Sequence, residues 1–135
     1  MGTSLISFNF IEKARINVYE EFPKNFELKR VFTVYGGNKE VRGGHAHKKC
    51  TQILICVRGK IDVNIKGKDK IVLSDPSVGL KIPPLIWSSQ TYQKDETILM
   101  VLCDKKYDEN DYIRSYSDYF RNHKSIVGCF KNKNT

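Results

Sequence analysis

The sequence predicts an all-β protein, built as a sandwich or a small barrel, and three observations support this class. First, the segment Lys60–Lys66 alternates between polar and apolar residues, which places Ile61, Val63 and Ile65 on one face of a strand. Second, short apolar segments recur about every 8–12 residues along the chain. Third, the spacers between these segments are rich in Gly, Pro, Asn and Asp, which favour turns.

The remaining strands follow from the same pattern of β-branched and aromatic residues between turn signals. We expect them at Leu5–Phe10, Ile16–Tyr19, Leu28–Tyr35, Gln52–Val57, Lys70–Leu73, Gly79–Ile82, Ile86–Tyr92 and Thr97–Cys103.

The C-terminal segment departs from the strand pattern and predicts a short helix. Asp108 is the expected N-cap, and Tyr112, Tyr116 and Phe120 follow at intervals of four residues. We expect this aromatic stripe to pack across the mouth or the edge of the sheet. Residues 124–135 are expected to form a loose basic tail, so that residues 1–135 make one domain whose core spans about 5–120.

The composition is that of a globular protein. The chain has 135 residues, of which 40% are hydrophobic and 28% are charged, and this length buries a core without disulfides or metals. The apolar runs are too short to span a bilayer, and the N-terminus lacks the basic and apolar regions of a signal peptide. We therefore expect a soluble, cytoplasmic protein with no membrane partner.

The four cysteines are expected to be structural. Cys50, Cys56, Cys103 and Cys129 form no C-x-x-C pair, which argues against a zinc ribbon and against a dithiol redox motif. Cys56 and Cys103 lie inside apolar runs, where a thiol usually acts as a small buried hydrophobic group.

The net charge of +8 raises the question of a nucleic-acid partner. The lysines are scattered through turns and the tail, and no Arg-rich helix, zinc finger or RNA-binding aromatic signature accompanies them. A positive field also suits a smaller polyanion, such as a diphosphate-bearing metabolite. Charge alone does not choose between these partners, and we expect no nucleic-acid binding.

The segment Arg42–Lys49, with the sequence RGGHAHKK, carries the strongest chemical signal. His45 and His47 are two residues apart, so on a strand they point to the same face. We expect the nearby cations Arg42 and Lys48 to lower the pKa of these imidazoles and to bind a phosphate or an enolate oxygen. This set favours proton abstraction next to a carbonyl. The chain carries neither a dinucleotide fingerprint nor a nucleophile motif, which excludes hydride and acyl transfer.

The spacing of these histidines matches a known pattern. His45, His47, Gln52 and Gly59 reproduce the spacing of the first cupin motif, H-x-H-x(3–4)-E-x(6)-G. In metal-dependent cupins the two histidines, the Glu and a later His bind the metal. Here Gln52 and Ser88 stand at the last two positions, and a neutral amide with a hydroxyl replaces a carboxylate and an imidazole poorly. We expect a cupin-like jelly-roll barrel with no metal and no other cofactor.

Several blocks between Lys29 and Tyr119 carry a more specific resemblance. They are Lys29–Val31, Arg42–Lys49, Gln52–Gly59, Leu73–Leu80, Pro84–Trp87 and Tyr107–Tyr116. Together they resemble the cupin-type sugar 3,4-ketoisomerases, which act on TDP-4-keto-6-deoxyglucose in the pathways to the 3-amino-3,6-dideoxyhexoses of lipopolysaccharide or S-layer glycans. The last block is the most specific, because no general cupin pattern requires it.

The resemblance implies a homodimeric jelly roll that moves a keto group from C4 to C3 of a TDP-linked hexose through an enediol. By position, His47 is the base that takes the C3 proton, and His45 is its partner in proton transfer or in binding the enediol oxygens. Arg42 and Lys48 would bind the substrate and neutralise developing charge. Arg30, directed inward on its strand, is a candidate for the diphosphate.

The resemblance names two further candidates for substrate binding, and the chain differs from the family at two positions. Arg15 matches a family arginine near the N-terminus, and Trp87 is a candidate for lining the sugar or thymine pocket. Phe32 stands where many relatives have a Tyr, and Ser88 stands where they tend to have a His. The proton donor to C4 is therefore open: water, Tyr35 or another group. Tyr35 has the opposite strand parity, which makes it a poor substitute.

Three alternatives are kept. The first is a nucleotide-sugar epimerase of the same barrel type, which inverts carbon centres and leaves the carbonyl at C4. The second is a non-catalytic cupin that binds an anionic ligand, and the third is a nucleic-acid-binding barrel. The sequence leaves open whether the product has the galacto or the gluco configuration at C4.

Overall fold

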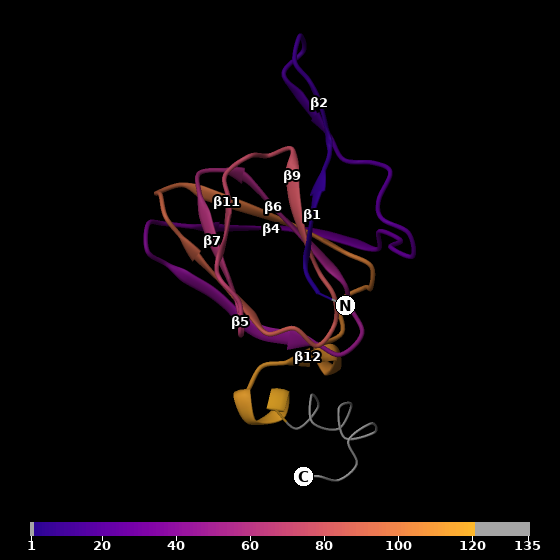
Figure 1. Cartoon of the computed structure of the whole chain (residues 1–135), viewed down its shortest axis with the longest axis vertical. Coiled ribbons are helices and arrows are strands. Elements are labelled where there is room, and N and C mark those ends of the chain that lie inside the picture. Colours follow the sequence, from indigo (N-terminus) through magenta and orange to yellow (C-terminus); the bar gives the residue numbers. More distant parts are fainter. Residues whose placement is uncertain (1, 121–135) are drawn as a thin grey trace.

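The structure is a computed structural model that describes residues 2–120. Two antiparallel five-stranded sheets face each other and enclose a barrel, as Figure 1 shows. The first sheet has the order β1 (Ser4–Ser7), β9 (Val78–Ile82), β6 (Gln52–Arg58), β11 (Thr97–Cys103) and β4 (Arg30–Gly36). The second has the order β12 (Tyr112–Ile113), β5 (Val41–His47), β10 (Ser88–Tyr92), β7 (Ile61–Ile65) and β8 (Ile71–Leu73). The predicted all-β jelly-roll class is confirmed.

Side-chain alternation explains how the sheets face each other. On β7, Ile61, Val63 and Ile65 are buried between the sheets as predicted. Strands β6 and β11 are apolar on both faces, because a second cluster around Phe8 and Phe26 covers the outer face of the first sheet. This double burial accounts for the continuous apolar run in the sequence of β6.

The cysteine prediction is confirmed where it falls on described residues. Cys50, Cys56 and Cys103 are buried free thiols, whereas Cys129 and the predicted basic tail lie outside the described residues. Within residues 2–120, no helix is both long and apolar enough to cross a membrane.

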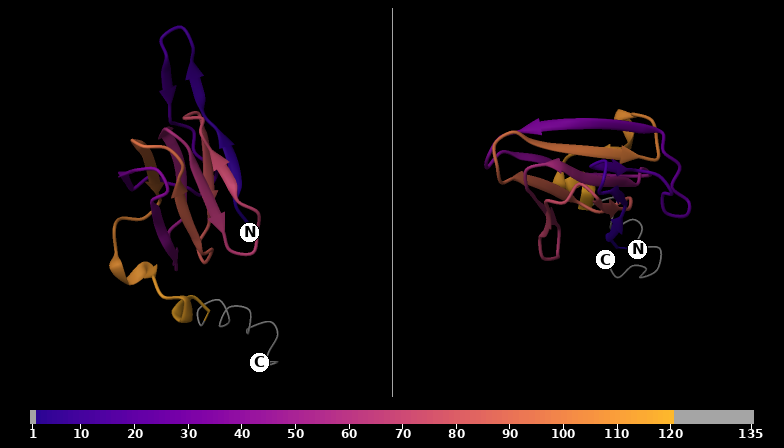
Figure 2. Two further views of the ribbon diagram at one scale, coloured as in Figure 1. Left: turned by 90° about the vertical axis from the view of Figure 1, so that its left-hand side faces the viewer. Right: turned by 90° about the horizontal axis from the view of Figure 1, so that it is seen from above.

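The N-terminal strand prediction needs one correction. The expected strand Leu5–Phe10 is divided at Phe8, whose ring packs into the cluster over the first sheet. The second half, β2 (Asn9–Ile11), pairs with β3 (Ile16–Val18) in a separate hairpin. This hairpin projects from one end of the barrel, opposite the end where β12 lies (Figures 1 and 2).

The C-terminal helix prediction was wrong in its start. Asp108 does cap a helical turn, but the turn is a short 3₁₀ helix, Glu109–Asp111, and β12 follows it directly. The α-helical segment begins at Tyr116, and the Ser115 hydroxyl accepts a hydrogen bond from the Asp118 N–H at 3.1 Å. Pairing with the free edge of β5 therefore outweighs the helical spacing of the aromatic residues.

Candidate active site

A β-bulge at Gly43 and Gly44 decides which side chains of β5 face the barrel interior. The register between β5 and β10 shifts by one residue within this glycine pair. Both glycines have positive φ, 86° and 77°, a conformation that other residues rarely adopt. The extra residue reverses the alternation of side chains, so Arg42 lies on the same face as His45 and His47.

A cavity of about 210 Å³ lies between the two sheets at this face of β5. Its apolar lining comes from β4, β6 and β11 and consists of Phe32, Val34, Leu54, Leu99 and Val101. Its polar lining consists of Arg42, His45, Gln52, Gln90 and Arg114. The structure thus brings Arg42 and His45 together as predicted.

One layer further along the strands, polar side chains from both sheets meet beside the residues that line this cavity. On the first sheet, Arg30 lies opposite Cys103, which in turn lies opposite Gln52. On the second sheet, Tyr112 pairs with His47. Arg30 Nη1 donates a hydrogen bond across the barrel to Tyr112 Oη at 3.3 Å. We call Arg30, His47 and Tyr112 the polar floor.

Several buried polar atoms near this floor have no hydrogen-bond partner. Within the described residues these orphans are Arg30 Nε, His45 Nδ1, His47 Nε2 and Tyr92 Oη. Buried polar groups are almost always bonded, because desolvation without a partner is costly. Three of the four belong to the floor or to His45 beside it, which indicates a ligand that supplies the missing partners there.

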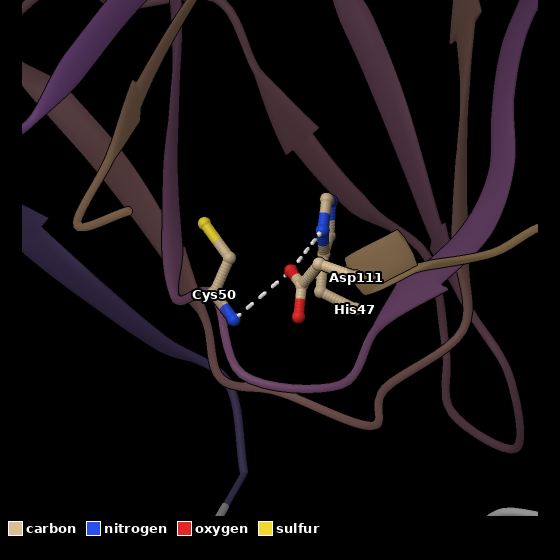
Figure 3. A group of neighbouring side chains, drawn as sticks. All are labelled: His47, Cys50 and Asp111. Atoms are coloured by element: carbon tan, nitrogen blue, oxygen red, sulfur yellow. Dashed lines mark hydrogen bonds and ion pairs between the residues drawn. The ribbon is translucent and has the colours of Figure 1, made fainter. Parts of the chain in front are cut away.

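Asp111 orients His47, as Figure 3 shows. His47 Nδ1 lies 3.0 Å from Asp111 Oδ2. The carboxylate also accepts hydrogen bonds from the backbone N–H groups of Lys49, at 2.7 Å, and Cys50, at 3.3 Å. Because an ionised carboxylate only accepts hydrogen bonds, Nδ1 carries the proton and Nε2 keeps its lone pair. His47 is only 5% exposed, so this geometry is fixed by packing as well.

Burial keeps both imidazoles uncharged near neutral pH. Desolvation, with the nearby His47 second, lowers the pKa of His45 to about 4. Burial also lowers the pKa of His47, although the hydrogen bond and the charge of Asp111 act in the opposite direction. Both rings are therefore able to accept a proton at pH 7.

The predicted direction of these shifts is confirmed, but the predicted cause was wrong. The leading cause is burial and not charge. The cations that contribute are Arg114, which acts on both rings, and Arg30, which acts on His47. Arg42 and Lys48, the expected sources, are not among them.

The donor atoms of His47, Cys50 and Asp111 lie within 4.8 Å of one another, a grouping able to hold a metal ion (Figure 3). Two features make this a poor metal site. The carboxylate oxygens of Asp111 already accept backbone N–H groups. A hydrogen bond with Cys103, together with burial, raises the pKa of Cys50, which keeps its thiol protonated. The arrangement fits an oriented histidine–carboxylate pair better than a metal centre.

Two predicted basic residues lie away from the cavity. Lys48 is exposed just beyond β5, where its backbone N–H donates to the carbonyl of Asp111 at 2.9 Å. Arg15 lies between β2 and β3, in the hairpin at the opposite end of the barrel from β12 (Figure 1). The structure of this chain therefore does not bring either side chain to the imidazoles.

Trp87 also lies elsewhere than predicted. Its ring packs against Tyr116 and Tyr119, with both centroid distances at 5.3 Å. The same cluster contains Ala46 of β5 and Ile113 of β12, which pair with each other on the sheet face opposite to the imidazoles. Trp87 thus anchors the C-terminal segment to the barrel from outside.

Sequence reasoning missed three residues of the site, Asp111, Tyr112 and Arg114. Arg114 Cζ lies 4.2 Å from the centre of the Tyr112 ring, and its Nε donates to Glu109 at 2.8 Å. The available signal was the block Tyr107–Tyr116, which stood out as specific but was assigned to a helix.

Comparisons with known proteins show the family to which this chain belongs. The family model described as "FdtA: WxcM-like, C-terminal" matches residues 1–124. The chain is 33% identical over 126 residues to a TDP-4-oxo-6-deoxy-alpha-D-glucose-3,4-oxoisomerase of Aneurinibacillus thermoaerophilus, and the match covers 88% of this chain and 91% of that protein.

Solved structures give the same relationship. QdtA, a sugar 3,4-ketoisomerase from Thermoanaerobacterium thermosaccharolyticum solved in complex with TDP, superimposes with a TM-score of 0.83 at 35% identity, over 93% of this chain and 96% of that one. WlaRA, a TDP-fucose-3,4-ketoisomerase from Campylobacter jejuni, gives a TM-score of 0.81 at 31% identity, over 94% and 99%. From its sequence and its fold, this chain belongs to the FdtA (WxcM-like, C-terminal) family.

Proposed function

We propose that this protein is an isomerase that converts TDP-4-keto-6-deoxyglucose into a TDP-3-keto-6-deoxyhexose. The observation that carries the proposal is His47, whose Nδ1 is held by Asp111 while its Nε2 is buried without a partner beside the cavity. Such a histidine is poised to take a proton. The relatives named above carry this isomerase activity in their names.

Proton transfer starts at C3 of the sugar. His47 Nε2 removes the C3 proton, and Asp111 stabilises the imidazolium that forms. The electron pair of the broken C–H bond forms the C3–C4 double bond, and the electron pair of the C4 carbonyl moves to O4. The His47 imidazolium gives its proton to O4, through His45 or a water molecule, so that an enediol forms and His47 is neutral again. His45, which lines the cavity as a neutral ring, hydrogen-bonds the enediol oxygens or completes the transfer. Protonation of C4 then leaves the carbonyl at C3.

We assign the arginines near the site to two parts of the substrate, the diphosphate and the sugar. Arg42 and Arg114 line the cavity and are the groups we assign to the diphosphate. Arg30 was expected there, but its hydrogen bond to Tyr112 in the floor supports a role at the sugar, where it neutralises charge that develops on O3 or O4. The overall charge of +8 favours capture of the TDP anion.

We also propose a homodimer that works in the cytoplasm. The projecting hairpin exposes Phe10, Ile11 and Ile16, and a second copy of the chain would bury such side chains. Buried free thiols suit a reducing compartment. Sedimentation of the protein should give the mass of a dimer, and the double variant Phe10→Ser/Ile16→Ser should shift it towards monomer. A monomeric wild-type protein would contradict this part of the proposal.

The reaction is tested by identifying the product. Incubation with TDP-4-keto-6-deoxyglucose, followed by carbon NMR, should show a carbonyl that has moved from C4 to C3. A product that keeps its carbonyl at C4 with an inverted ring centre would identify an epimerase instead. Binding of the substrate without any turnover would identify a non-catalytic binding protein.

A further inference from the structure

We propose that Tyr112 is the catalytic acid that delivers a proton to C4, with Arg30 holding its hydroxyl in place. This inference rests on the proposed isomerase function and names the group that protonates the second carbon. It also predicts the configuration of the product at C4.

The cavity needs such an acid, because its lining offers none. Apart from apolar side chains, the lining consists of amides, guanidinium groups and the neutral ring of His45. Guanidinium groups do not release protons in proteins. Phe32 has no hydroxyl, and Tyr35 lies on the outer face of β4, where it is 65% exposed. Tyr35, the one side chain named as a candidate donor from the sequence, is thereby removed.

Tyr112 stands where an acid is required. Its ring centre lies 4.3 Å from that of the base, His47, and 5.3 Å from that of His45. Strand pairing places it directly opposite His47, on the inner face of the same sheet. The neighbouring orphans Arg30 Nε and His47 Nε2 indicate that a ligand reaches this floor.

The hydroxyl of Tyr112 is arranged to donate. Its oxygen accepts a hydrogen bond from Arg30 Nη1 at 3.3 Å, so the phenol proton is left for another acceptor. The Arg30 guanidinium thus lies beside the oxygen on which negative charge develops as the proton leaves. Arg114 lies 4.2 Å from the ring centre and packs against the ring. Tyr107, the nearest other tyrosine, instead directs its hydroxyl to Glu109 at 2.7 Å.

The step balances without a further reactant. The phenol proton moves to C4, and the electron pair of the C3–C4 double bond forms the new C4–H bond. The O3–H bond breaks, and its electron pair forms the C3 carbonyl. The O3 proton returns to the phenolate through His45 or a water molecule, so Tyr112 ends each turnover as it began.

The shared position of base and acid fixes the stereochemistry. His47 and Tyr112 lie side by side on one sheet, so both reach the same face of the sugar ring. In the gluco series the hydrogens at C3 and C4 lie on opposite faces of the ring. His47 removes the C3 proton from one face of the ring, and Tyr112 adds a proton to C4 from that same face. The C4 hydroxyl of the product is therefore axial, and the product is TDP-3-keto-6-deoxygalactose.

The variant Tyr112→Phe separates the two half-reactions in deuterium oxide. The base is intact, so exchange of deuterium into C3 of the 4-keto sugar should continue within about threefold of the wild-type rate. Formation of the 3-keto sugar should fall about 100-fold or more, the magnitude expected for loss of a general acid. The matched control is Tyr107→Phe, which should keep both activities.

Each other outcome has a definite meaning. A 3-keto product formed at nearly the wild-type rate by Tyr112→Phe would overturn the proposal, and so would parallel loss of exchange and isomerisation in a folded variant. If Tyr112→Phe does not fold, the product of the wild-type protein decides: galacto supports the proposal, and gluco overturns it. Absence of both exchange and turnover in the wild-type protein would instead refute the proposed function itself.

Discussion

The two walls of the cavity differ in almost every respect. The catalytic wall, formed by β5, β10 and β12, carries His45, His47 and Tyr112, and two of these have buried nitrogens without a partner. The apolar wall, formed by β4, β6 and β11, is lined above the floor by Phe32, Val34, Leu54, Leu99 and Val101. The two walls therefore have different roles. The catalytic wall carries the groups that transfer protons, and the apolar wall excludes water from them.

The walls are also held together in different ways. Strands β6 and β11 of the apolar wall pack on both faces, between the barrel core and the cluster around Phe8 and Phe26. The catalytic wall depends on directed contacts, among them the hydrogen bonds to Asp111 and the pairing of β12 with β5. Substitutions on the apolar wall should therefore change the stability of the protein, and substitutions on the catalytic wall should change its turnover.

The largest effect is expected for His47→Asn. Loss of the base should reduce turnover by two orders of magnitude or more, since general-base catalysis contributes roughly 10²–10⁴. The measurement is kcat for conversion of the 4-keto sugar, with a thermal melt to show that the variant folds. Wild-type turnover in the folded variant would remove His47 from the base role.

The second prediction concerns the support of that base. Asp111→Asn should lower kcat by about tenfold to 100-fold, because the imidazolium loses its stabilising charge and Nδ1 loses its fixed acceptor.

The dependence of kcat on pH shows in which direction Asp111 shifts the pKa of His47. The base acts when neutral, so activity falls as pH drops through the pKa of His47, which lies below its ordinary value. Asp111 raises that pKa. Its removal should therefore move the acid limb of kcat against pH to lower pH. A limb that moves to higher pH would show that Asp111 does not act through the charge on His47.

The third prediction concerns binding at the edge of the catalytic wall. Arg42→Ala should raise KM about tenfold and leave kcat nearly unchanged, since the arginine is assigned to the diphosphate and not to the reacting carbons. Arg58 is a matched surface arginine, paired with Glu96 at 2.9 Å. Arg58→Ala should change neither constant. An equal rise in KM for both variants would assign the effect to net charge alone.

The smallest effect on chemistry is expected from the apolar wall. Leu99→Ala removes a side chain that is 2% exposed and should cost about 2–5 kcal/mol of unfolding free energy. The turnover of the folded fraction should change by only a few fold. Urea denaturation and kcat, measured on the same preparation, check both statements. If Leu99→Ala lost as much turnover as His47→Asn, the proposal that only the catalytic wall carries the chemistry would be wrong.

The sequence was sufficient for the parts that depend on local pattern. The strand alternation of Ile61, Val63 and Ile65 predicted the fold class, and the spacing of His45 and His47 predicted a shared inward face. The sequence also predicted that Arg42 lies near the two histidines, although strict strand alternation would have turned its side chain outward. The bulge at the glycine pair is what brings it inside.

The rest depends on contacts between distant segments. Asp111 and Tyr112 follow β5 by more than sixty residues, as the His47–Asp111 separation of 64 shows. The interval of four between Tyr112 and Tyr116 fits a helix equally well on local grounds. Only the free edge of β5, which no local pattern reveals, makes β12 a strand. The role of burial in the imidazole pKa values was missed for the same reason, because burial depends on contacts with segments distant in the sequence.

The most direct test of the account is proton NMR of TDP-4-keto-6-deoxyglucose in deuterium oxide with chelator-treated protein. Acid–base chemistry by the catalytic wall predicts a 3-keto sugar that carries deuterium at C4, formed at the same rate as by untreated protein. Absence of exchange at every ring carbon, or activity that returns only when a divalent metal is added, would contradict it.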